Sequence, residues 1–226
     1  MAGKRVLFLC TSHAALGDTG KSTGVWAEEV AAPYYILKEA GCHIDIASIK
    51  GGKIPLDPES LEGNLNDHTH SFLKDHHGLK SKVESSLSID EASEDYDAVF
   101  LPGGHGVCYD FPDNPALITL LEKFWAEGKV VASVCHGPVG FVNIKAPDGE
   151  YIVKGKKVTG FTNSEEDAVG KTAFVPFLLE DKLKERGAHF ERANDWNPYA
   201  VADGKLITGQ NPMSSEKLAK LILEAL

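Results

Sequence analysis

The sequence of 226 residues contains no apolar run long enough for a membrane-spanning helix, so we expect no transmembrane segment. Its first five residues lead into only a short apolar strand, without the longer apolar stretch and cleavage site of a secretory signal. The four cysteines are scattered without paired spacing. This pattern suits reduced thiols and favours a cytoplasmic location.

Basic residues are also scarce. Lys and Arg number 23 against 33 Asp and Glu, which gives a formal net charge of −10. Nucleic acids and anionic membranes are bound by clusters of Lys and Arg, so both are excluded as partners and a neutral or small substrate is favoured. A content of 42% hydrophobic and 25% charged residues is typical of a single globular domain, which we expect over residues 1–226.

Strand and helix patterns alternate along most of the chain. Residues 6–10 predict a buried strand, residues 25–39 have helical spacing, and residues 43–49 predict a second strand. Residues 97–101 predict a further strand and residues 115–127 an amphipathic helix. Such repeated alternation predicts an α/β fold with a mostly parallel sheet and helices on both faces.

The C-terminal part predicts a hairpin followed by a helix. Strands over residues 199–202 and 205–208 are joined by an Asp-Gly turn, and the last helix follows Pro212. Trp196 and Asn197 precede this hairpin. We expect a role in the core or at the surface for them, with a pocket or an interface as the alternative.

Residues 50–95 interrupt the alternation with a polar, irregular insertion, typical of a lid or an interaction surface. It contains His68, His70, His76 and His77. A zinc site is one interpretation, since imidazole is a common zinc ligand. Neither pair has a spacing diagnostic of zinc and no cysteine joins them, so we expect solvated loop histidines and no metal.

The central motif lies at residues 129–138, where a run of small and β-branched residues ends in Cys135. Gly137 and Pro138 permit a tight turn into a following helix, so the pattern predicts a nucleophile elbow at the carboxyl end of a buried strand. The amino end of that helix and His136 would favour the thiolate form of Cys135. A buried structural cysteine is the alternative.

A glycine-rich segment, Gly103-Gly104-His105-Gly106, directly follows the strand predicted at residues 97–101. Glycines at a strand end allow backbone N–H groups to approach a ligand closely, and two such groups form an oxyanion hole beside an elbow. Phosphate binding is disfavoured, because the P-loop Lys-Ser/Thr and the Rossmann glycine spacing are both missing. A simple turn is the remaining alternative.

Together, the motifs at residues 103–106, 134–138 and 158–162, the last followed by acidic residues, resemble the ThiJ/PfpI superfamily, relatives of the class I glutamine amidotransferases. The chain is most similar to the heat-shock glyoxalase III branch, also described as protein deglycases, and the similarity extends to residues 209–212. The resemblance implies a flavodoxin-like three-layer sandwich, a Cys-His-acid triad, a homodimer and no cofactor.

The resemblance also implies two catalytic glutamates. One follows a Thr-Gly-Val run and falls on Glu29, with Glu28 a quarter-turn away on the same helix. The other, the triad acid that orients His136, falls on Glu166, with Glu165 and Asp167 as neighbouring alternatives. Residues of the oxyanion and substrate site are then Gly103, Gly104 and His136.

A thiolate beside backbone N–H donors and a carboxyl group can attack an aldehyde or an acyl carbonyl. The resemblance points to 2-oxoaldehydes such as methylglyoxal, converted to D-lactate by a lyase without metal or glutathione. In that reaction Cys135 forms a hemithioacetal, Glu29 or His136 moves a proton between the two carbons, and water releases the product. Glycated proteins are further substrates that the resemblance implies. A PfpI-type cysteine peptidase or amidase and a stress-response holdase chaperone are the alternatives.

Overall fold

A computed structural model describes residues 3–92 and 95–226. Residues 1–2, part of the N-terminal segment considered above, and residues 93–94 of the predicted insertion lie outside the described residues. None of the described helices combines the length and the apolar character that crossing a membrane requires.

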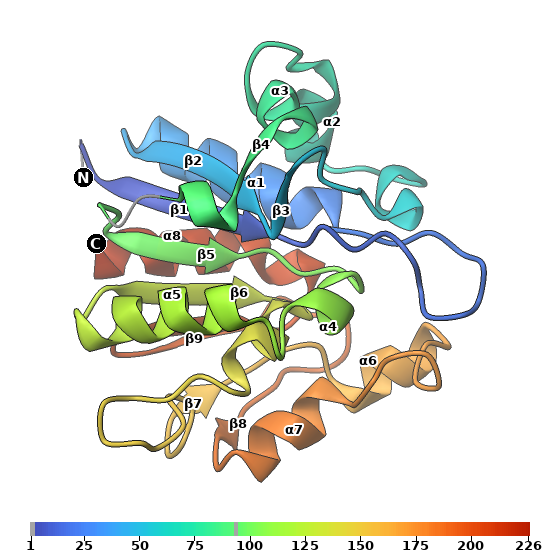
Figure 1. Ribbon diagram of the computed structural model, residues 1–226. Helices are drawn as coiled ribbons and strands as arrows, with labels where there is room; N and C mark the ends of the chain where they lie inside the picture. The colour runs from blue at the N-terminus through green and yellow to red at the C-terminus, as the bar shows by residue number, and fades with distance from the viewer. Residues whose placement is uncertain (1–2, 93–94) are drawn as a thin grey trace.

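Eight strands form one mixed sheet in the order β3-β4-β2-β1-β5-β6-β10-β9 (Figure 1). Its strands are β1 (Arg5–Cys10), β2 (His43–Ser48), β3 (Lys50–Gly52), β4 (Ser86–Ser88), β5 (Ala98–Leu101), β6 (Val130–Val134), β9 (Ala200–Asp203) and β10 (Leu206–Gly209). The central strands are parallel, and only the edge pairs β3/β4 and β9/β10 are antiparallel. A separate parallel pair joins β7 (Lys157–Val158) and β8 (His189–Phe190). The predicted mostly parallel α/β sheet is confirmed.

Helices cover both faces of the sheet (Figure 1). They are α1 (Ala27–Glu39), α2 (Asp67–Lys74), α3 (Leu79–Glu84), α4 (Val107–Asp110), α5 (Pro115–Ala126), α6 (Asn163–Ala168), α7 (Leu179–Glu185) and α8 (Ser215–Ala225). Short 3₁₀ segments are η1 (Pro58–Leu61), η2 (Ile89–Glu91), η3 (Gly137–Phe141) and η4 (Pro212–Ser214).

Alternate residues of β1 divide the core into two layers. Val6 and Phe8 pack with α1 and α8 on one face, whereas Leu7 and Leu9 pack with α5 and α7 on the other. Because side chains of a strand alternate between faces, a strand buried on both faces is apolar throughout. This explains the uninterrupted apolar run at residues 6–10 and confirms the three-layer sandwich expected from the resemblance.

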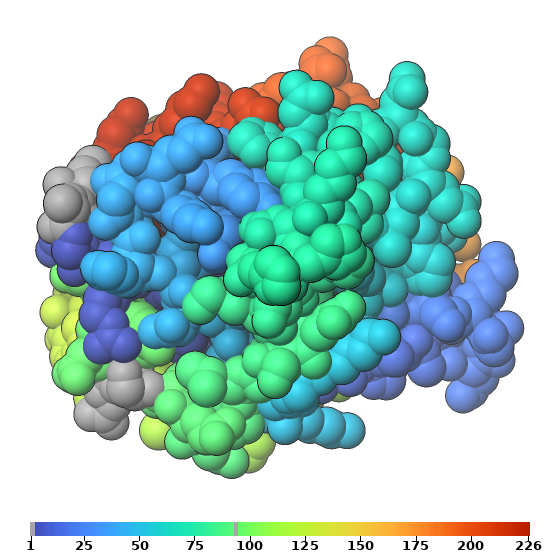
Figure 2. All heavy atoms as spheres, turned by 90° about the horizontal axis from the view of Figure 1, so that it is seen from above, coloured from blue at the N-terminus to red at the C-terminus, as the bar shows by residue number. Residues whose placement is uncertain are grey.

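The segment of residues 50–95 is more regular than predicted. It contributes β3 and β4 to one edge of the sheet, and α2 packs against α1. Figure 2 shows the atoms of this segment, cyan to green, over much of the face seen from above. The weak periodicity of the sequence follows from the shortness of its elements, since two three-residue strands and two short helices give no sustained repeat.

The turn after β6 differs from the prediction in one respect. Cys135 and His136 are followed by η3, a five-residue 3₁₀ helix, instead of an α-helix. Pro138 lacks an N–H group, and Gly137 and Gly140 disfavour helix continuation, so no α-helix propagates here. A helix dipole therefore gives little support to a Cys135 thiolate, because that effect needs aligned peptide units over several turns.

Close packing of backbones around this turn requires Gly137. A Cβ atom there would lie 2.2 Å from Ser133 Oγ and 2.4 Å from the Leu101 carbonyl oxygen, both buried. Gly137→Ala is therefore expected to lower the free energy of unfolding by about 1–3 kcal/mol, measured by denaturant titration. Gly160→Ala is the matched control: its Cβ would meet mainly the movable Leu179 side chain, at 2.9 Å. A control that is destabilised as much as Gly137→Ala would contradict this account.

Candidate active site

Cys135 occupies the elbow between β6 and η3, with a backbone φ of 60°. This left-handed conformation is unusual for a residue with a side chain and is held by the neighbours on both sides. The Cys135 N–H donates to the Gly209 carbonyl at 2.9 Å, and its carbonyl accepts from the Phe161 N–H at 2.8 Å. The strain places the sulfur at the carboxyl edge of the parallel strands, where open α/β sheets bind ligands.

The structure brings Cys135, His136 and Glu166 together. Cys135 Sγ lies 3.4 Å from His136 Nδ1, and His136 Nε2 lies 2.5 Å from Glu166 Oε2. An ionised carboxylate only accepts hydrogen bonds, so His136 carries its proton on Nε2 and presents the Nδ1 lone pair to the thiol. Three buried groups thus have the arrangement of a nucleophile, a base and an orienting acid.

Glu166 also accepts a hydrogen bond from a second histidine. His105 Nε2 lies 2.7 Å from Glu166 Oε1, and the two imidazole rings are 4.1 Å apart between centroids. Burial opposes the charge of Glu166, but His136 and His105 outweigh burial and hold the pKa of this carboxyl well below its usual range. Glu166 is therefore the charged acid of the site. The sequence prediction included His105 only as part of the glycine-rich segment.

Glu29 lies fully buried on α1, where its Oε2 accepts from the Gly103 N–H at 2.7 Å. Its Oε1 has no partner of normal hydrogen-bond geometry in the described part of the chain, and the Cys135 thiol lies close enough to interact with the carboxyl. Glu28, the neighbour considered above, is half-buried and stands outside this arrangement. The structure therefore brings Glu29 to Cys135, as the resemblance implied.

Burial sets the charge of both groups. It raises the pKa of the Glu29 carboxyl well above its usual range, despite the hydrogen bonds with Cys135 and Gly103. Burial, followed by the charge and hydrogen bond of Glu29, also raises the pKa of the Cys135 thiol, opposite to the direction expected from a helix dipole. Both shifts favour the protonated forms, a thiol beside a carboxylic acid.

One part of the predicted oxyanion site is corrected. Because the Gly103 N–H is bound to Glu29, it cannot also donate to a substrate oxygen. Gly104 lines the pocket, has a φ of 99°, and its N–H donates to no residue within the described ranges. A Cβ atom at Gly104 would lie 2.3 Å from the Gly24 carbonyl oxygen, so only glycine fits. Gly104 and the N–H of His136 are the remaining candidate donors.

The three adjacent acids have separate roles. Glu165 is fully buried, and its Oε1 accepts from Trp196 N–H, Gln210 Nε2 and Asn211 Nδ2, at 2.9, 3.1 and 2.8 Å. Its Oε2 completes a capping box with Thr162 at the start of α6. Glu165 is therefore a structural acid that ties three segments together, while Asp167 is exposed.

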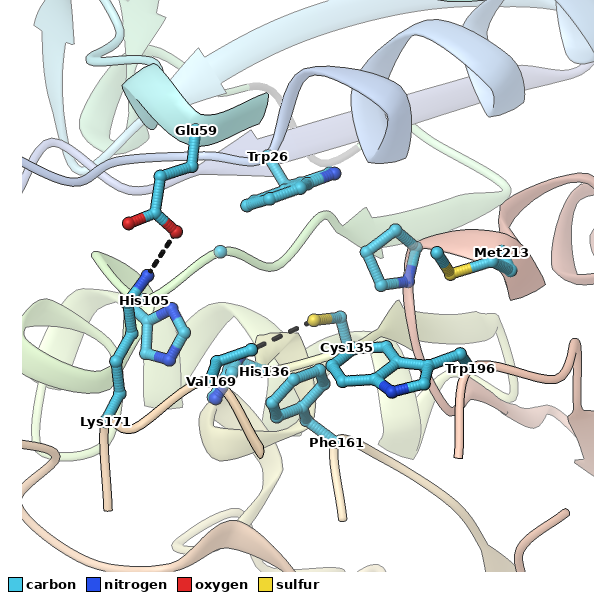
Figure 3. A pocket seen from close by; sticks show the side chains of 12 residues that line it. Trp26, Glu59, His105, Cys135, His136, Phe161, Val169, Lys171, Trp196 and Met213 are labelled. Carbon is cyan, nitrogen blue, oxygen red and sulfur yellow. Dashed lines mark hydrogen bonds and ion pairs between the residues drawn. The ribbon is translucent and has the colours of Figure 1, made fainter. Parts of the chain in front are cut away.

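A pocket with a cavity volume of about 80 Å³ opens above Cys135 (Figure 3). Its walls are largely apolar and come from segments far apart in the sequence: Trp26, Phe161, Val169, Trp196 and Met213. The sequence predicted a core or surface role for Trp196 and Asn197, with a pocket or an interface as the alternative. Trp196 is exposed and lines this pocket, whereas Asn197 does not line it.

An ion pair between Lys171 Nζ and Glu59 Oε2, 2.8 Å long, lies in the same pocket wall (Figure 3). The two residues are 112 positions apart, and neither belongs to a recognisable motif, so no sequence signal could have identified them. Glu59 comes from η1, which shows that the predicted insertion contributes to the site.

Within the described ranges, one group of three side chains has the spacing of possible metal ligands: His105, His136 and Glu166. Both carboxylate oxygens are already bound by imidazole N–H groups at 2.7 and 2.5 Å, so a metal would have to displace two protons. Of the insertion histidines, His70, His76 and His77 are exposed, and His68 lies 3.5 Å from Glu216. The arrangement thus favours acid-base over metal chemistry.

Known proteins resemble this chain over its whole length. The family model described as "DJ-1/PfpI family" matches residues 22–225. Glyoxalase 3 of Candida albicans is 31% identical, with 98% of each chain covered. Glutathione-independent glyoxalase HSP31 of Saccharomyces cerevisiae is 31% identical and covers 100% of this chain and 99% of its own.

Solved structures show the same fold. The crystal structure of glyoxalase III from Candida albicans superposes with a TM-score of 0.89 at 29% identity, covering 99% of this chain and 97% of that one. The Rapid Encystment Protein 24 KDa of Francisella tularensis gives a TM-score of 0.94 at 39% identity, with 98% of both chains covered. The matched region thus spans the segments that contain the elbow, the glycine-rich segment and both buried glutamates.

The roles of Glu165 and Glu166 can be distinguished by making the same substitution, Glu to Gln, at each position. Glu165→Gln places an NH₂ group among N–H donors and is expected to destabilise the fold by about 1–3 kcal/mol. Glu166→Gln is expected to slow the reaction of Cys135 with iodoacetamide, because the charge that orients and stabilises protonated His136 is lost. Denaturant titration and peptide-resolved alkylation measure the two effects. A stable Glu165→Gln together with a fully reactive Glu166→Gln would reverse the assignment.

The raised pKa of Glu29 predicts a pH-dependent stability. The unfolded chain loses this proton near pH 4.3, whereas the folded protein keeps it, so the stabilising contribution is complete at lower pH and is lost as pH rises through the folded pKa. The loss is at most about 1.4 kcal/mol for each pH unit. Glu29→Gln cannot titrate. Its melting temperature relative to wild type should therefore increase from pH 5 to pH 8, and a pH-independent difference would contradict a buried neutral Glu29.

Proposed function

The chain belongs to the DJ-1/PfpI family, and we propose that it is a glutathione-independent glyoxalase that converts methylglyoxal and related 2-oxoaldehydes to 2-hydroxy acids, D-lactate from methylglyoxal. The observation that supports this most is a buried thiol placed between a neutral acid, Glu29, and a base, His136. The relatives named glyoxalases match over their full length. We propose a lyase.

The first step forms a hemithioacetal. As Sγ attacks the aldehyde carbon C1, the thiol proton moves to His136 Nδ1, 3.4 Å away. The carbonyl oxygen becomes an oxyanion near the N–H groups of Gly104 and His136, and His136 then protonates it. Glu166 holds the imidazolium in position during the transfer. Because the thiolate exists only while the bond forms, the raised pKa of Cys135 does not prevent attack.

The second step moves hydrogen from C1 to C2. His136 Nδ1 removes the C1 proton while the neutral Glu29 protonates the C2 oxygen, which gives an enediol. His136 then returns its proton to C2, and the C1 hydroxyl proton passes to the Glu29 carboxylate, which leaves a thioester with a C2 hydroxyl. C1 is oxidised and C2 is reduced, so no external oxidant or reductant is needed. Water attacks the thioester and releases the hydroxy acid and the thiol.

The size of the site supports a small substrate. A cavity of about 80 Å³ walled by Trp26, Phe161 and Trp196 suits a compact molecule, while a peptidase of the same elbow type requires an open groove. We also propose a homodimer and glycated proteins as further substrates, as the resemblance implies, and a cytoplasmic location, which the scattered cysteines favour. A holdase function would be independent of Cys135.

The proposal is tested by incubating methylglyoxal without glutathione and measuring lactate by chiral detection. Wild type should form D-lactate. Cys135→Ala should form none, and Glu29→Gln should be slower by about 10²–10⁴, the range for loss of a general acid. Cys42→Ala, a buried cysteine outside the site, is the matched control and should keep wild-type activity.

Three results would contradict the proposal. A wild type that forms no lactate rejects the glyoxalase. Lactate from Cys135→Ala rejects the covalent route. Suppression of aggregation that survives in Cys135→Ser, without lactate from wild type, favours the holdase.

A further inference from the structure

His105 is a buried part of the site that the mechanism above does not use. It follows β5, between Gly104 and Gly106, and its side chain is almost completely enclosed. A Cβ atom at Gly106 would lie 2.6 Å from the His13 carbonyl oxygen, so the chain must come close here to turn the histidine inward. The ring lies beside that of His136, with 4.1 Å between centroids and an angle of 44° between the ring planes, and it lines the pocket (Figure 3).

The hydrogen bond to Glu166 fixes which nitrogen of His105 carries the proton. Nε2 lies 2.7 Å from the charged carboxylate and must donate, so Nδ1 keeps a free lone pair. Nδ1 accepts from no residue within 3–92 or 95–226. Burial and the neighbouring His136 lower the pKa of His105 to about 4, which keeps this lone pair available at neutral pH. The pocket wall therefore contains a hydrogen-bond acceptor without a protein donor.

We propose that His105 binds the reacting molecule: its Nδ1 accepts a hydrogen bond from the hydroxyl group on C2 of the enediol and of the thioester. This inference rests on the proposed function. C1 is bonded to the sulfur and its oxygen faces the backbone N–H groups, so C2 lies one carbon further into the pocket. His105 correspondingly lies one ring beyond His136, whose Nδ1 is in contact with the sulfur.

A hydrogen-bond acceptor at this place stabilises the enediol and the thioester more than the substrate. The substrate has a carbonyl oxygen on C2, which cannot donate to Nδ1, whereas the enediol and the thioester have a hydroxyl group that can. A contact that forms only as the reaction proceeds raises kcat more than it lowers KM. His105 then helps to pull the hemithioacetal toward the enediol.

The test uses two aldehydes that differ only at C2. Glycolaldehyde has a C2 hydroxyl and acetaldehyde has none, and both form hemithioacetals with a thiol. Each is titrated against the alkylation of Cys135 by iodoacetamide, followed by peptide mass spectrometry, to give a protection constant. In wild type, glycolaldehyde should protect Cys135 better than acetaldehyde by roughly tenfold, a factor within the range of one hydrogen bond.

Two variants separate the nitrogens of His105. His105→Gln keeps an N–H donor for Glu166 but removes the Nδ1 acceptor. The preference for glycolaldehyde, with each protection constant taken relative to the variant's own alkylation rate without aldehyde, should fall roughly tenfold. His105→Asn places an oxygen near the Nδ1 position and should keep the preference. Circular dichroism and melting temperature verify folding, and the Asn variant serves alone where the Gln variant does not fold.

An equal preference in wild type and His105→Gln overturns the inference, as does loss of the preference in a folded His105→Asn. The inference is also overturned if His105→Gln changes the alkylation rate of Cys135 without aldehyde and this change explains the whole loss of the glycolaldehyde preference. His105 would then act only through Glu166. The protection assay requires no turnover. A wild type that shows the preference but makes no lactate rejects the glyoxalase and retains the acceptor role of His105.

Discussion

The hydrogen bonding of one buried carboxylate, Glu166, to two imidazole N–H groups determines the chemistry of the whole site. A charged carboxylate in the interior is unfavourable unless donors compensate it, and His105 and His136 supply one donor to each oxygen. The same bonds fix both imidazole tautomers, so that each ring directs a lone pair away from Glu166. One of these lone pairs faces the thiol of Cys135.

Glu29 is also a buried carboxyl group, but its surroundings favour the protonated form instead of the charged one. It receives one backbone N–H group, from Gly103, and no cation, so burial keeps it protonated where Glu166 stays charged. Two carboxyl groups of identical chemistry thus become an acid and an anion through their surroundings alone. Removing a hydrogen-bond donor from Glu166 would favour its protonated form, and adding a donor to Glu29 would favour its charged form. Neither change requires the Cys135 sulfur to move.

The fold and the elbow could be predicted because local patterns decide them. The apolar run at residues 6–10 and the strand ending at Cys135 correspond directly to β1 and β6, and the parallel pairing of β5 with β6 brings the glycine-rich segment to the elbow. The remaining features depend on tertiary contacts that no local pattern encodes. The partner of the Gly103 N–H comes from α1, 74 positions earlier. Glu165 and Glu166 are both buried in the first turn of α6, so burial does not distinguish their roles. Their roles differ only in the hydrogen-bond partners that the fold brings to each carboxyl group.

Burial of the thiol, which the tight-turn motif did not specify, has a consequence for selectivity. A permanently ionised cysteine reacts with any electrophile or oxidant that reaches it, whereas in the proposed mechanism Cys135 transfers its proton to His136 as it attacks. Such a thiol reacts fastest with molecules that enter the pocket and whose developing oxyanion meets the Gly104 and His136 N–H groups. Small carbonyl compounds satisfy both conditions. The apolar walls around Trp26 and Trp196 provide a less polar surrounding than water, which strengthens electrostatic contacts to a carbonyl bound there.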